Sequence, residues 1–522
     1  MAWEQQKFQL PIFRDFVPEN IRFWIMLLFP IAFQMSDAVF MGLSAEIAAS
    51  QSLMSEDILM CGYAGMIGVT MTFPLLFRLK FRFTTYQILL TVCLSMAAIS
   101  IICMNIRFMP MMIVLSFVFG MLKLVGSFEC FSSVMLKVAP RYNFAPFLSL
   151  VFTIVFSSIE LSAIVSSHIL HQMPWQYMNL FSINMLLVLA LVVVTCMKSI
   201  RLMPLQPLFG IGWIGLVLWG IMLLSFAFIC VYGEHLNWFK SNYIHIATGL
   251  IFITLALNIY RMTHYRHPFI SVAAFRYRNI FNMLVLYLLG CIMLSAESVL
   301  QHIFTGEVLG FDAITSSNVR YFTLLGIAAG AVFSTLAIEH LGWGYKRLVF
   351  VTFLFLTFYE VMMFCIISPD TNIGALYLPS FFCGMGHVMI FIVITTYMEG
   401  IVPFQHRFEV LCILGFVRIG CGAAFGAALF GHFFKTEMSE NIALIGSQLN
   451  GIAAAQMPSG TAAQIVANQS IMLSLQHLFG FAAVLGVVSM IIVALGNFRN
   501  SVKLTYPNWV KVAKILKKEM KR

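Results

Sequence analysis

The chain has 522 residues, of which 61% are hydrophobic and only 10% are charged. A soluble chain has about 25% charged residues, so this composition excludes a soluble enzyme, a nucleic-acid-binding protein and a disulfide scaffold. The formal net charge is +10, from 31 Lys and Arg against 21 Asp and Glu. In a membrane protein the placement of those cations reports orientation. The sequence therefore predicts an all-α polytopic membrane protein.

Fourteen apolar runs are long enough to cross a bilayer, since each has about 20–28 residues. They begin near Ile21, Asp57, Thr84, Met109, Ala145, Tyr177, Leu208, Tyr243, Ile280, Val319, Tyr345, Ala375, Glu409 and Ser470. An even number of crossings puts both termini on the same side of the membrane. The segment before Ile21 has no small-residue cleavage site, so we do not expect a signal peptide there.

The cations of the predicted loops lie mostly on one side. If the N-terminus is cytoplasmic, the outer loops hold only Arg107, Lys240 and Lys435, with Arg320 at an outer helix end, although the chain has 31 Lys and Arg. Loops on the cytoplasmic side of a membrane carry an excess of Lys and Arg. This bias predicts that both termini are cytoplasmic.

Three segments between or after the spans are longer than a tight turn. Residues 261–279 form a basic, aromatic inner loop, and residues 501–522 form a basic amphipathic tail suited to anionic lipid headgroups. The outer loop 435–468 is predicted to contain an external helix within Asn441–Gln456, followed by a break at Pro458–Gly460. No nucleotide-binding loop, zinc-ligand spacing or nucleophile elbow occurs. We therefore expect no enzyme activity, no metal and no cofactor, with transport energy taken from a gradient.

Ionisable side chains inside the spans are the candidate functional residues. Those that lie deepest are Asp37, Lys123, Glu129, Glu160, Glu297, Glu360, His387 and Arg418. A charge near the bilayer centre costs several kcal/mol or more, so each one calls for an explanation. In one interpretation the carboxylates bind and release protons during transport. In the other they pair with Lys123 or Arg418 and only hold helices together.

The two interpretations are weighed residue by residue. For Asp37, Glu129 and Glu160 we favour proton coupling, because carboxylates outnumber the nearby intramembrane cations. The segment around Glu360 looks lipid-facing, which favours a structural role for it. Arg418 always keeps its charge, so we expect a counter-ion or a substrate anchor. The predicted residues of the substrate cavity are Lys123, Glu297, His387 and Arg418, although a histidine in such a place is often only a packed side chain.

Small residues predict where helices pack closely. Gly326 and Gly330 lie four residues apart in one span, and Gly420, Gly422, Gly426 and Gly431 follow Arg418 in another. Such spacing lets helix backbones approach within a membrane.

Several motifs resemble those of the fourteen-span drug:proton antiporters of the major facilitator superfamily, the EmrB/QacA type. Met35–Ser50 is similar to the first-span motif of that family, with Asp37 on its Asp. Met173–Leu187, Leu300–Asn318 and Gly415–Leu429 resemble three further family segments, and Arg418 falls on the Arg of the last one. The resemblance runs over nearly the whole chain.

Other family motifs are altered in this sequence. Arg82 matches the Arg of the loop after the second span, but Phe81 stands where the family has Asp. The Gly-Pro antiporter motif of the fifth span is absent, and Glu160 stands in that region. The fourth-span Arg is also missing, and Lys123 is its nearest substitute. Proton antiport is thus implied less directly than the fold.

The resemblance implies a major facilitator fold with 14 transmembrane helices. Residues 1–200 would form an N-terminal six-helix bundle, 201–265 two inserted helices, 266–500 a C-terminal six-helix bundle with the outer loop 435–468, and 501–522 the cytoplasmic tail. The two bundles would rock against each other for alternating access, with Arg82 in a gating loop. The implied location is the inner (cytoplasmic) membrane, and the implied partners are a periplasmic adaptor protein and an outer-membrane channel that meet the outer loop.

Three functions remain open at this stage. The first is export of small amphipathic or hydrophobic compounds coupled to inward proton flow, for which 34 Met and 51 Phe offer soft, adaptable walls. The second is a dedicated transporter of one endogenous metabolite or lipid-like compound without proton antiport, which the altered motifs favour. The third is a membrane sensor or assembly factor that has lost transport.

Overall fold

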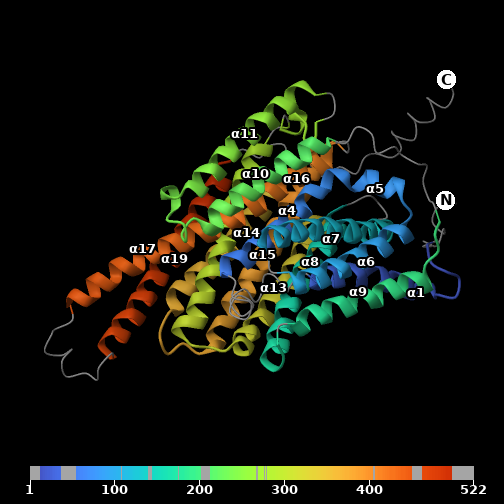
Figure 1. Cartoon of the computed structure of the whole chain (residues 1–522). Helices are drawn as coiled ribbons and strands as arrows, with labels where there is room; N and C mark the ends of the chain where they lie inside the picture. The colour runs from blue at the N-terminus through green and yellow to red at the C-terminus, as the bar shows by residue number, and fades with distance from the viewer. Residues whose placement is uncertain are drawn as a thin grey trace.

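The computed structural model of the chain describes residues 12–36, 54–106, 108–138, 144–174, 176–200, 212–265, 268–275, 277, 279–403, 406–448 and 461–496. Within these ranges, 13 helices are long and apolar enough to cross a membrane. The described part of the first predicted span is a further helix, α1 (Glu19–Met35). The described part of every predicted span is therefore helical, and the all-helical membrane fold is confirmed (Figure 1).

The first six spans make up the first half of the chain, and their buried apolar residues divide between two clusters. One cluster lies within this half, whereas buried residues of the second and fifth spans join a cluster that includes the second half. The six spans are α1, α4 (Ser55–Thr72) continued by η1 (Phe73–Leu75) and α5 (Leu76–Arg82), α6 (Thr85–Asn105), α7 (Met109–Val138), α8 (Phe144–Gln172) and α9 (Gln176–Cys196). Fully buried Phe29, Leu89 and Val193 belong to a cluster whose members all lie between residues 12 and 197. Helix α6 begins at a capping box, in which Thr84 accepts from the backbone of Gln87.

The two inserted helices lie along the seam between the halves of the chain. They are α10 (Trp213–Tyr232) and α11 (Asn242–His264), joined by η2 (Trp238–Lys240). Helix α10 packs on α11, on α4 of the first half and on the π-helix η8 (Val417–Ala424) of the second half. The Trp219 ring lies 4.9 Å from that of Phe416. The inserted pair therefore touches both halves.

The last six spans form the second half, which begins with the short η3 (Val272–Phe275). Its first three spans are α12 (Ile280–Ala296), which the π-helices η4 (Glu297–Gln301) and η5 (Phe304–Val308) extend, α13 (Ala313–Glu339) and α14 (Tyr345–Ile366). Its last three spans are η6 (Ile373–Leu376) with α15 (Tyr377–Ile401), α16 (Arg407–Phe416) continued by η8 and α17 (Phe425–Gln448), and α19 (Thr461–Leu495). Asp312 caps α13 by accepting from the backbone of Thr315.

Most of the predicted outer loop 435–468 is helical. The helix expected within Asn441–Gln456 is present as far as Gln448, as an unbroken extension of α17, and α19 begins at Thr461. No proline interrupts the chain before Gln448, so nothing in the sequence ends α17 where the membrane span ends. Asn441 donates to the hydroxyl of Ser474 at 2.9 Å. Figure 1 shows α17 and α19 projecting together beyond the other helices.

Most of the glycines that were predicted to allow close helix packing do lie at such contacts. A Cβ on Gly326 would lie 2.1 Å from the carbonyl oxygen of Phe381, and one on Gly330 would lie 2.8 Å from that of Met385, so α13 and α15 make backbone contact. Gly422 and Gly426 are equally tight against α12. Gly431 has nothing within 4 Å. The first half has the matching contact between α4 and α7, where a Cβ on Gly120 would lie 1.9 Å from the carbonyl oxygen of Gly65.

Helix ends that were predicted on the same side meet in the structure. Phe13, before α1, pairs with Met197 after α9, and the Lys346 ammonium at the start of α14 donates to Ala494 O at the end of α19. We call this side of the molecule the inner side. Tyr232, at the end of α10, bonds Asp57 at the start of α4 on the opposite, outer side. The alternation of the ends follows the prediction, and the assignment of the inner side to the cytoplasm stays a prediction.

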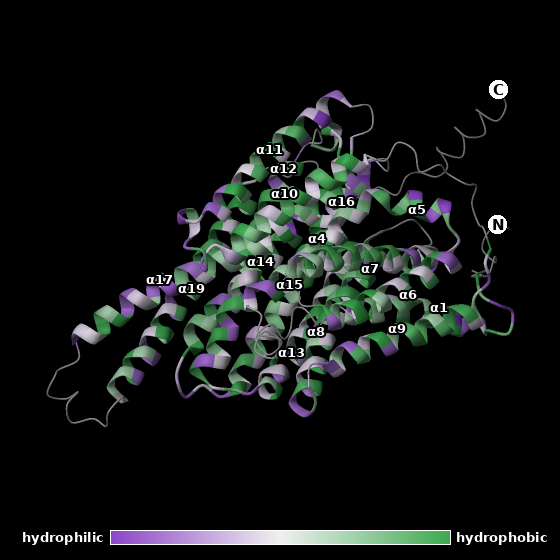
Figure 2. Ribbon diagram, viewed as in Figure 1, coloured by the Kyte–Doolittle hydropathy of each residue, from purple (hydrophilic) through white to green (hydrophobic). Residues whose placement is uncertain are grey.

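Figure 2 shows hydrophobic residues along nearly the full length of the helices, with hydrophilic residues concentrated toward their ends. Helix α14 presents a stripe of exposed apolar side chains that is typical of a lipid-facing surface: Phe350, Leu354, Phe358, Val361 and Phe364. The charged residues inside the bundle therefore stand out against an apolar background.

Candidate functional site

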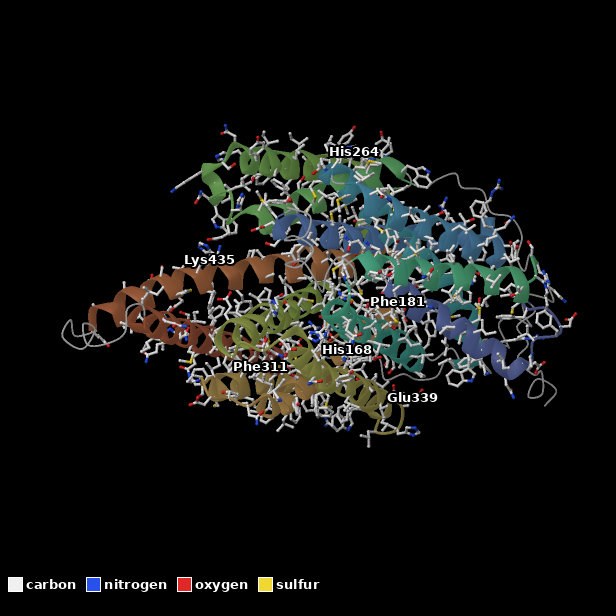
Figure 3. The ribbon with its side chains drawn as sticks, turned by 60° about the horizontal axis from the view of Figure 1, so that its bottom comes forward. His168, Phe181, His264, Phe311, Glu339 and Lys435 are labelled. Carbon is white, nitrogen blue, oxygen red and sulfur yellow. The ribbon has the colours of Figure 1, made fainter. Side chains whose placement is uncertain are left out.

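The two halves meet along α8 and α13. Ser149 of α8 donates to Ala331 O of α13 at 3.0 Å, and α8 also packs against α15. Figure 3 shows α13, between Phe311 and Glu339, alongside the helix that carries His168, which is α8. Side chains on the facing surfaces of these helices join the halves directly, and they define the candidate site.

An ion pair between Arg320 and Glu160 joins the two halves. Arg320 Nη1 of α13 lies 3.0 Å from Glu160 Oε2 of α8, with 46% and 13% of the two side chains exposed. Glu297, at the start of η4, lies within electrostatic range of both residues. Its Oε2 accepts from Cys383 Sγ of α15 at 3.0 Å. The structure thus brings together one cation and two carboxylates, of which Glu160 was predicted for proton coupling and Glu297 for the substrate cavity.

Arg418 lies among aromatic rings from both halves. The centre of its guanidinium is 5.0 Å from the Phe156 ring of α8 and 4.6 Å from the Phe391 ring of α15. His387 lies 4.5 Å from Phe156 and 5.5 Å from Phe391, measured between ring centroids. Tyr287 of α12 closes the cluster, 5.4 Å from Phe391. Two predicted cavity residues, His387 and Arg418, are therefore neighbours.

Glu360 corrects an expectation from the sequence. Its segment looked lipid-facing, but Glu360 is only 1% exposed, and the lipid-facing stripe of α14 lies on the other side of the helix. Its Oε2 has no hydrogen-bond partner among the described residues, and the carboxyl is within electrostatic range of Glu297. Residues four apart share a helix face, so Phe350 and Leu354 lie on the exposed face of α14. Glu360 lies six residues after Leu354, which places it on a different face of the helix.

Glu129 lies at the inner side of the molecule, apart from Glu160, Glu297 and Arg320. It is 3% exposed, accepts from Thr85 Oγ1 at 2.6 Å, and lies 3.8 Å from the Lys80 ammonium. Lys80 lies on α5, which continues the second span as far as Arg82. The pair with Lys80 fits the interpretation of a helix-joining contact, and the proton-coupling role of Glu129 stays a prediction.

The remaining predicted residues are placed as follows. Lys123 is 5% exposed on α7, and Arg82 is exposed at the end of α5. Asp37 lies outside the described residues. The described residues include no group of three or more His, Cys, Asp or Glu side chains that could hold a metal ion. The cavity role of Lys123 and the gating role of Arg82 stay predictions.

Aromatic rings hold the inner side of the two halves together. Phe408 of α16 lies 4.3 Å from Phe77 of α5 and 5.7 Å from Phe128 of α7, between ring centroids. Close by, a Cβ on Gly415 would lie 2.4 Å from Thr70 Cγ2. We call Phe77, Phe128 and Phe408 the inner aromatic cluster. In this conformation it closes the inner side between the halves.

Phe408→Ala is expected to weaken that closure. Aromatic pairs contribute about 0.5–1.5 kcal/mol each beyond their buried area, and this change removes two of them. Backbone amides of α5 should therefore exchange with deuterium about tenfold faster or more. Phe350→Ala, at a lipid-facing position of α14, is the control and should leave that exchange unchanged. Equal exchange in Phe408→Ala and wild type would show that the cluster does not hold the halves.

The outer end of α10 is tied to both halves. Tyr232 bonds Asp57 of the first half. Glu234 Oε2 lies 3.0 Å from His432 Nδ1 of α17, and Glu234 Oε1 lies 3.8 Å from the Lys435 ammonium. Lys435 marks this part of α17 in Figure 3. Partial burial alone would raise the pKa of Glu234, but hydrogen bonds from His432 and Trp238 and the Lys435 charge outweigh it and lower the pKa below 4.5.

The contact of Glu234 with α17 should depend on pH. If folding lowers the pKa of a carboxyl, ionisation of that carboxyl stabilises the folded state. For Glu234 the stabilisation is fully present at pH values above the ordinary pKa of 4.5, and it disappears as the pH falls through the lowered pKa. The pair is partly exposed, so we expect only about 1–2 °C in Tm. Wild type should melt above Glu234→Gln at pH 7, and the difference should close below pH ~4. Glu440→Gln, an exposed change on α17, is the control. A difference that is independent of pH would contradict the assignment.

The fold is that of known transporters. A POT family transporter in complex with 5-aminolevulinic acid matches with a TM-score of 0.57 and 12% identity, over 93% of this chain and 98% of that chain. The human organic anion transporter MFSD10 (TETRAN) matches with a TM-score of 0.54 and 11% identity, over 91% of this chain and 100% of that chain. The MFS (major facilitator superfamily) proton:xylose symporter XylE bound to 6-bromo-6-deoxy-D-glucose matches with a TM-score of 0.51 and 13% identity, over 90% of this chain and 94% of that chain.

These likenesses establish the fold alone, because the sequence identities are low. The chain has the major facilitator fold, as predicted. No protein-family model and no curated protein matches the sequence. The finer resemblance to the EmrB/QacA drug antiporters is not confirmed and stays a prediction.

Proposed function

We propose that the protein is a membrane transporter that moves small amphipathic compounds by alternating access. Residues 1–200 and 266–500 are the two halves that tilt, and the inserted helices of residues 201–265 accompany them. The observation that carries this proposal is that charged side chains of both halves meet inside the apolar spans, at Glu160 and Arg320. Intramembrane charges facing a bundle interior mark substrate and ion pathways. The major facilitator fold supports the proposal further.

We further propose that transport is coupled to protons through Arg320. In the present conformation Arg320 is paired with Glu160 of the other half, while Glu297 of its own half accepts only a thiol. If the halves separate between α8 and α13, Arg320 loses Glu160, and Glu297 remains within its electrostatic range. A proton then binds the carboxylate that Arg320 has left. Protonation and the tilt of the halves would thereby be linked.

The direction we propose is export of the compound with inward proton flow. The test is substrate-induced proton release from the purified protein at several pH values, followed by transport in liposomes under an imposed pH gradient. We expect compound movement that reverses with the gradient and stops when a protonophore is added. Movement that ignores the gradient would support the second candidate, a dedicated transporter without proton antiport. No movement of any compound would contradict transport altogether.

The second candidate is favoured by the fixed position of Arg418. A permanent cation held between two rings suits one type of charged group better than a broad range of compounds. The two candidates differ in substrate range, so a binding screen that finds a single chemical class would favour the dedicated transporter.

We also propose that the projecting pair α17 and α19 meets a periplasmic adaptor protein, which would lead to an outer-membrane channel. The pair carries exposed apolar side chains at Ile442 and Leu444, beyond the bulk of the helices. Replacing residues 441–466 by a short Gly-Ser linker should abolish export across the cell envelope while transport in liposomes persists. Export that persists in cells after this replacement would argue against adaptor docking.

A further inference from the structure

Arg418 occupies an unusual place for a cation. It lies in η8, where the chain is π-helical from Val417 to Ala424. Single π-helical turns inside α-helices are rare and occur frequently at functional sites. Among the described residues, no Asp or Glu lies within ion-pair distance of Arg418, which contacts the rings of Phe156 and Phe391. Its positive charge is therefore not neutralised by this part of the protein.

Ring contacts stabilise a guanidinium but leave its donors unused. The five N–H groups of arginine lie in the plane of the guanidinium, whereas a ring attracts the charge with its face and accepts no strong hydrogen bond. A charge inside the membrane without a counter-ion is unfavourable, so an incoming anion would be bound strongly there. The arrangement is that of a cation kept ready for a negative partner.

His387 supplies a second unused polar atom at the same place. Its Nδ1 is buried and has no hydrogen-bond partner among the described residues. The imidazole lies against Phe156, one of the two rings that contact Arg418. Buried polar atoms nearly always have a partner, so an unpartnered one beside an unneutralised cation indicates that a ligand belongs there.

We infer that Arg418 and His387 form the subsite that binds the carboxylate of an amphipathic organic anion, whose apolar body packs against Phe156, Phe391 and Tyr287. A carboxylate matches the planar fork of a guanidinium with two parallel hydrogen bonds. The aromatic walls favour an aromatic or long aliphatic body over a polar one. This inference rests on the proposed transport function and names its substrate class.

The site also links the ligand to both halves. Phe156 belongs to α8 of the first half, whereas Arg418, His387, Phe391 and Tyr287 belong to the second half. An anion on Arg418 therefore contacts the first half only while Phe156 remains close. Occupancy of the subsite favours the conformation in which the halves are together at this level, since a ligand shifts an equilibrium by its differential affinity.

The test is binding to the purified full-length protein, measured by isothermal titration calorimetry. The probes are benzoate, 4-phenylbutyrate and decanoate, each compared with its primary amide, which has the same body and no charge. Wild type is expected to bind at least one carboxylate about 10- to 100-fold more tightly than its amide, the range for hydrogen bonds to a charged group. Arg418→Gln should remove that preference, and Arg418→Lys should reduce it because the fork is lost.

The control is Arg347→Gln, which removes an exposed arginine at the start of α14 and should keep the full preference. Equal affinity for every acid and its amide in wild type would overturn the inference, as would an unchanged preference in monodisperse Arg418→Gln. A carboxylate preference that depends on Arg418, without transport in liposomes, would support the subsite and contradict the proposed transport. Gradient-driven transport of amphipathic compounds without any carboxylate preference would support the proposed transport and contradict the subsite.

Discussion

Glu297→Gln is expected to reduce proton-driven transport by about 100-fold or more, and Glu160→Gln is expected to do the same. Glutamine keeps the size and one carbonyl oxygen of glutamate, but it neither takes up a proton nor attracts Arg320 as a charge. If Arg320 passes between Glu160 and Glu297 as the halves tilt, loss of either carboxylate leaves the arginine with a single partner. The measurement is compound movement in liposomes under a pH gradient, with Glu440→Gln as the control.

A charge exchange separates proton coupling from simple bracing of the helices. In the double variant Glu160→Arg with Arg320→Glu, the ion pair between α8 and α13 is kept with its charges reversed. If the pair only braces the halves, the double variant should transport like wild type. In our account it melts near the wild-type temperature but stays inactive, because position 320 no longer carries a cation that can move to Glu297. Full activity of the double variant, or of Glu297→Gln, would contradict the coupling scheme.

Gly120→Leu and Gly384→Leu are expected to prevent the protein from folding. A Cβ on Gly120 would lie 1.9 Å from the carbonyl oxygen of Gly65, and one on Gly384 would lie 2.2 Å from that of Thr323. In both places the obstacle is backbone, which cannot turn away as a side chain does. Forcing the helices apart in a packed bundle should cost about 3 kcal/mol or more.

The measurement is the yield of monodisperse protein and its Tm after purification. Gly431→Leu is the matched control, because nothing lies within 4 Å of the Cβ that this change would add. It lies on α17, so the same substitution in the same kind of helix should be tolerated. Normal yield and Tm for Gly120→Leu would show that α4 and α7 do not pack as closely as described.

The spans could be predicted from the sequence because a bilayer crossing needs only a long apolar run, and such runs are local. The close packing at Gly326 was predictable for the same reason, since four-residue spacing is local too. The partners of the charges were not predictable. Glu160 and Arg320 are far apart in the chain, and no local pattern indicates that α8 lies against α13.

Other misses have identifiable physical causes. The pairing of Glu129 with Lys80 was not predicted, because α5 extends the helix to Arg82 and thereby brings the Lys80 ammonium within 3.8 Å of Glu129. Glu360 was judged by the composition of its segment instead of by its face, and the face was decisive. The rings of Phe156 and Phe391 around Arg418 could not be singled out among 51 Phe. Composition identified the membrane, but only contacts between distant segments located the site.

The tilting of the two halves is tested most directly by distances between spin labels on both sides of the protein. One pair would replace Arg82 and His340 at the inner side, and the other Gln172 and Ala313 at the outer side; all four are exposed. Exposed Cys365 and Cys421 would first be changed to Ser. On changing pH or adding a bound carboxylate, the account predicts that one distance lengthens while the other shortens. Two distances that stay constant, or that change together in the same direction, would contradict it.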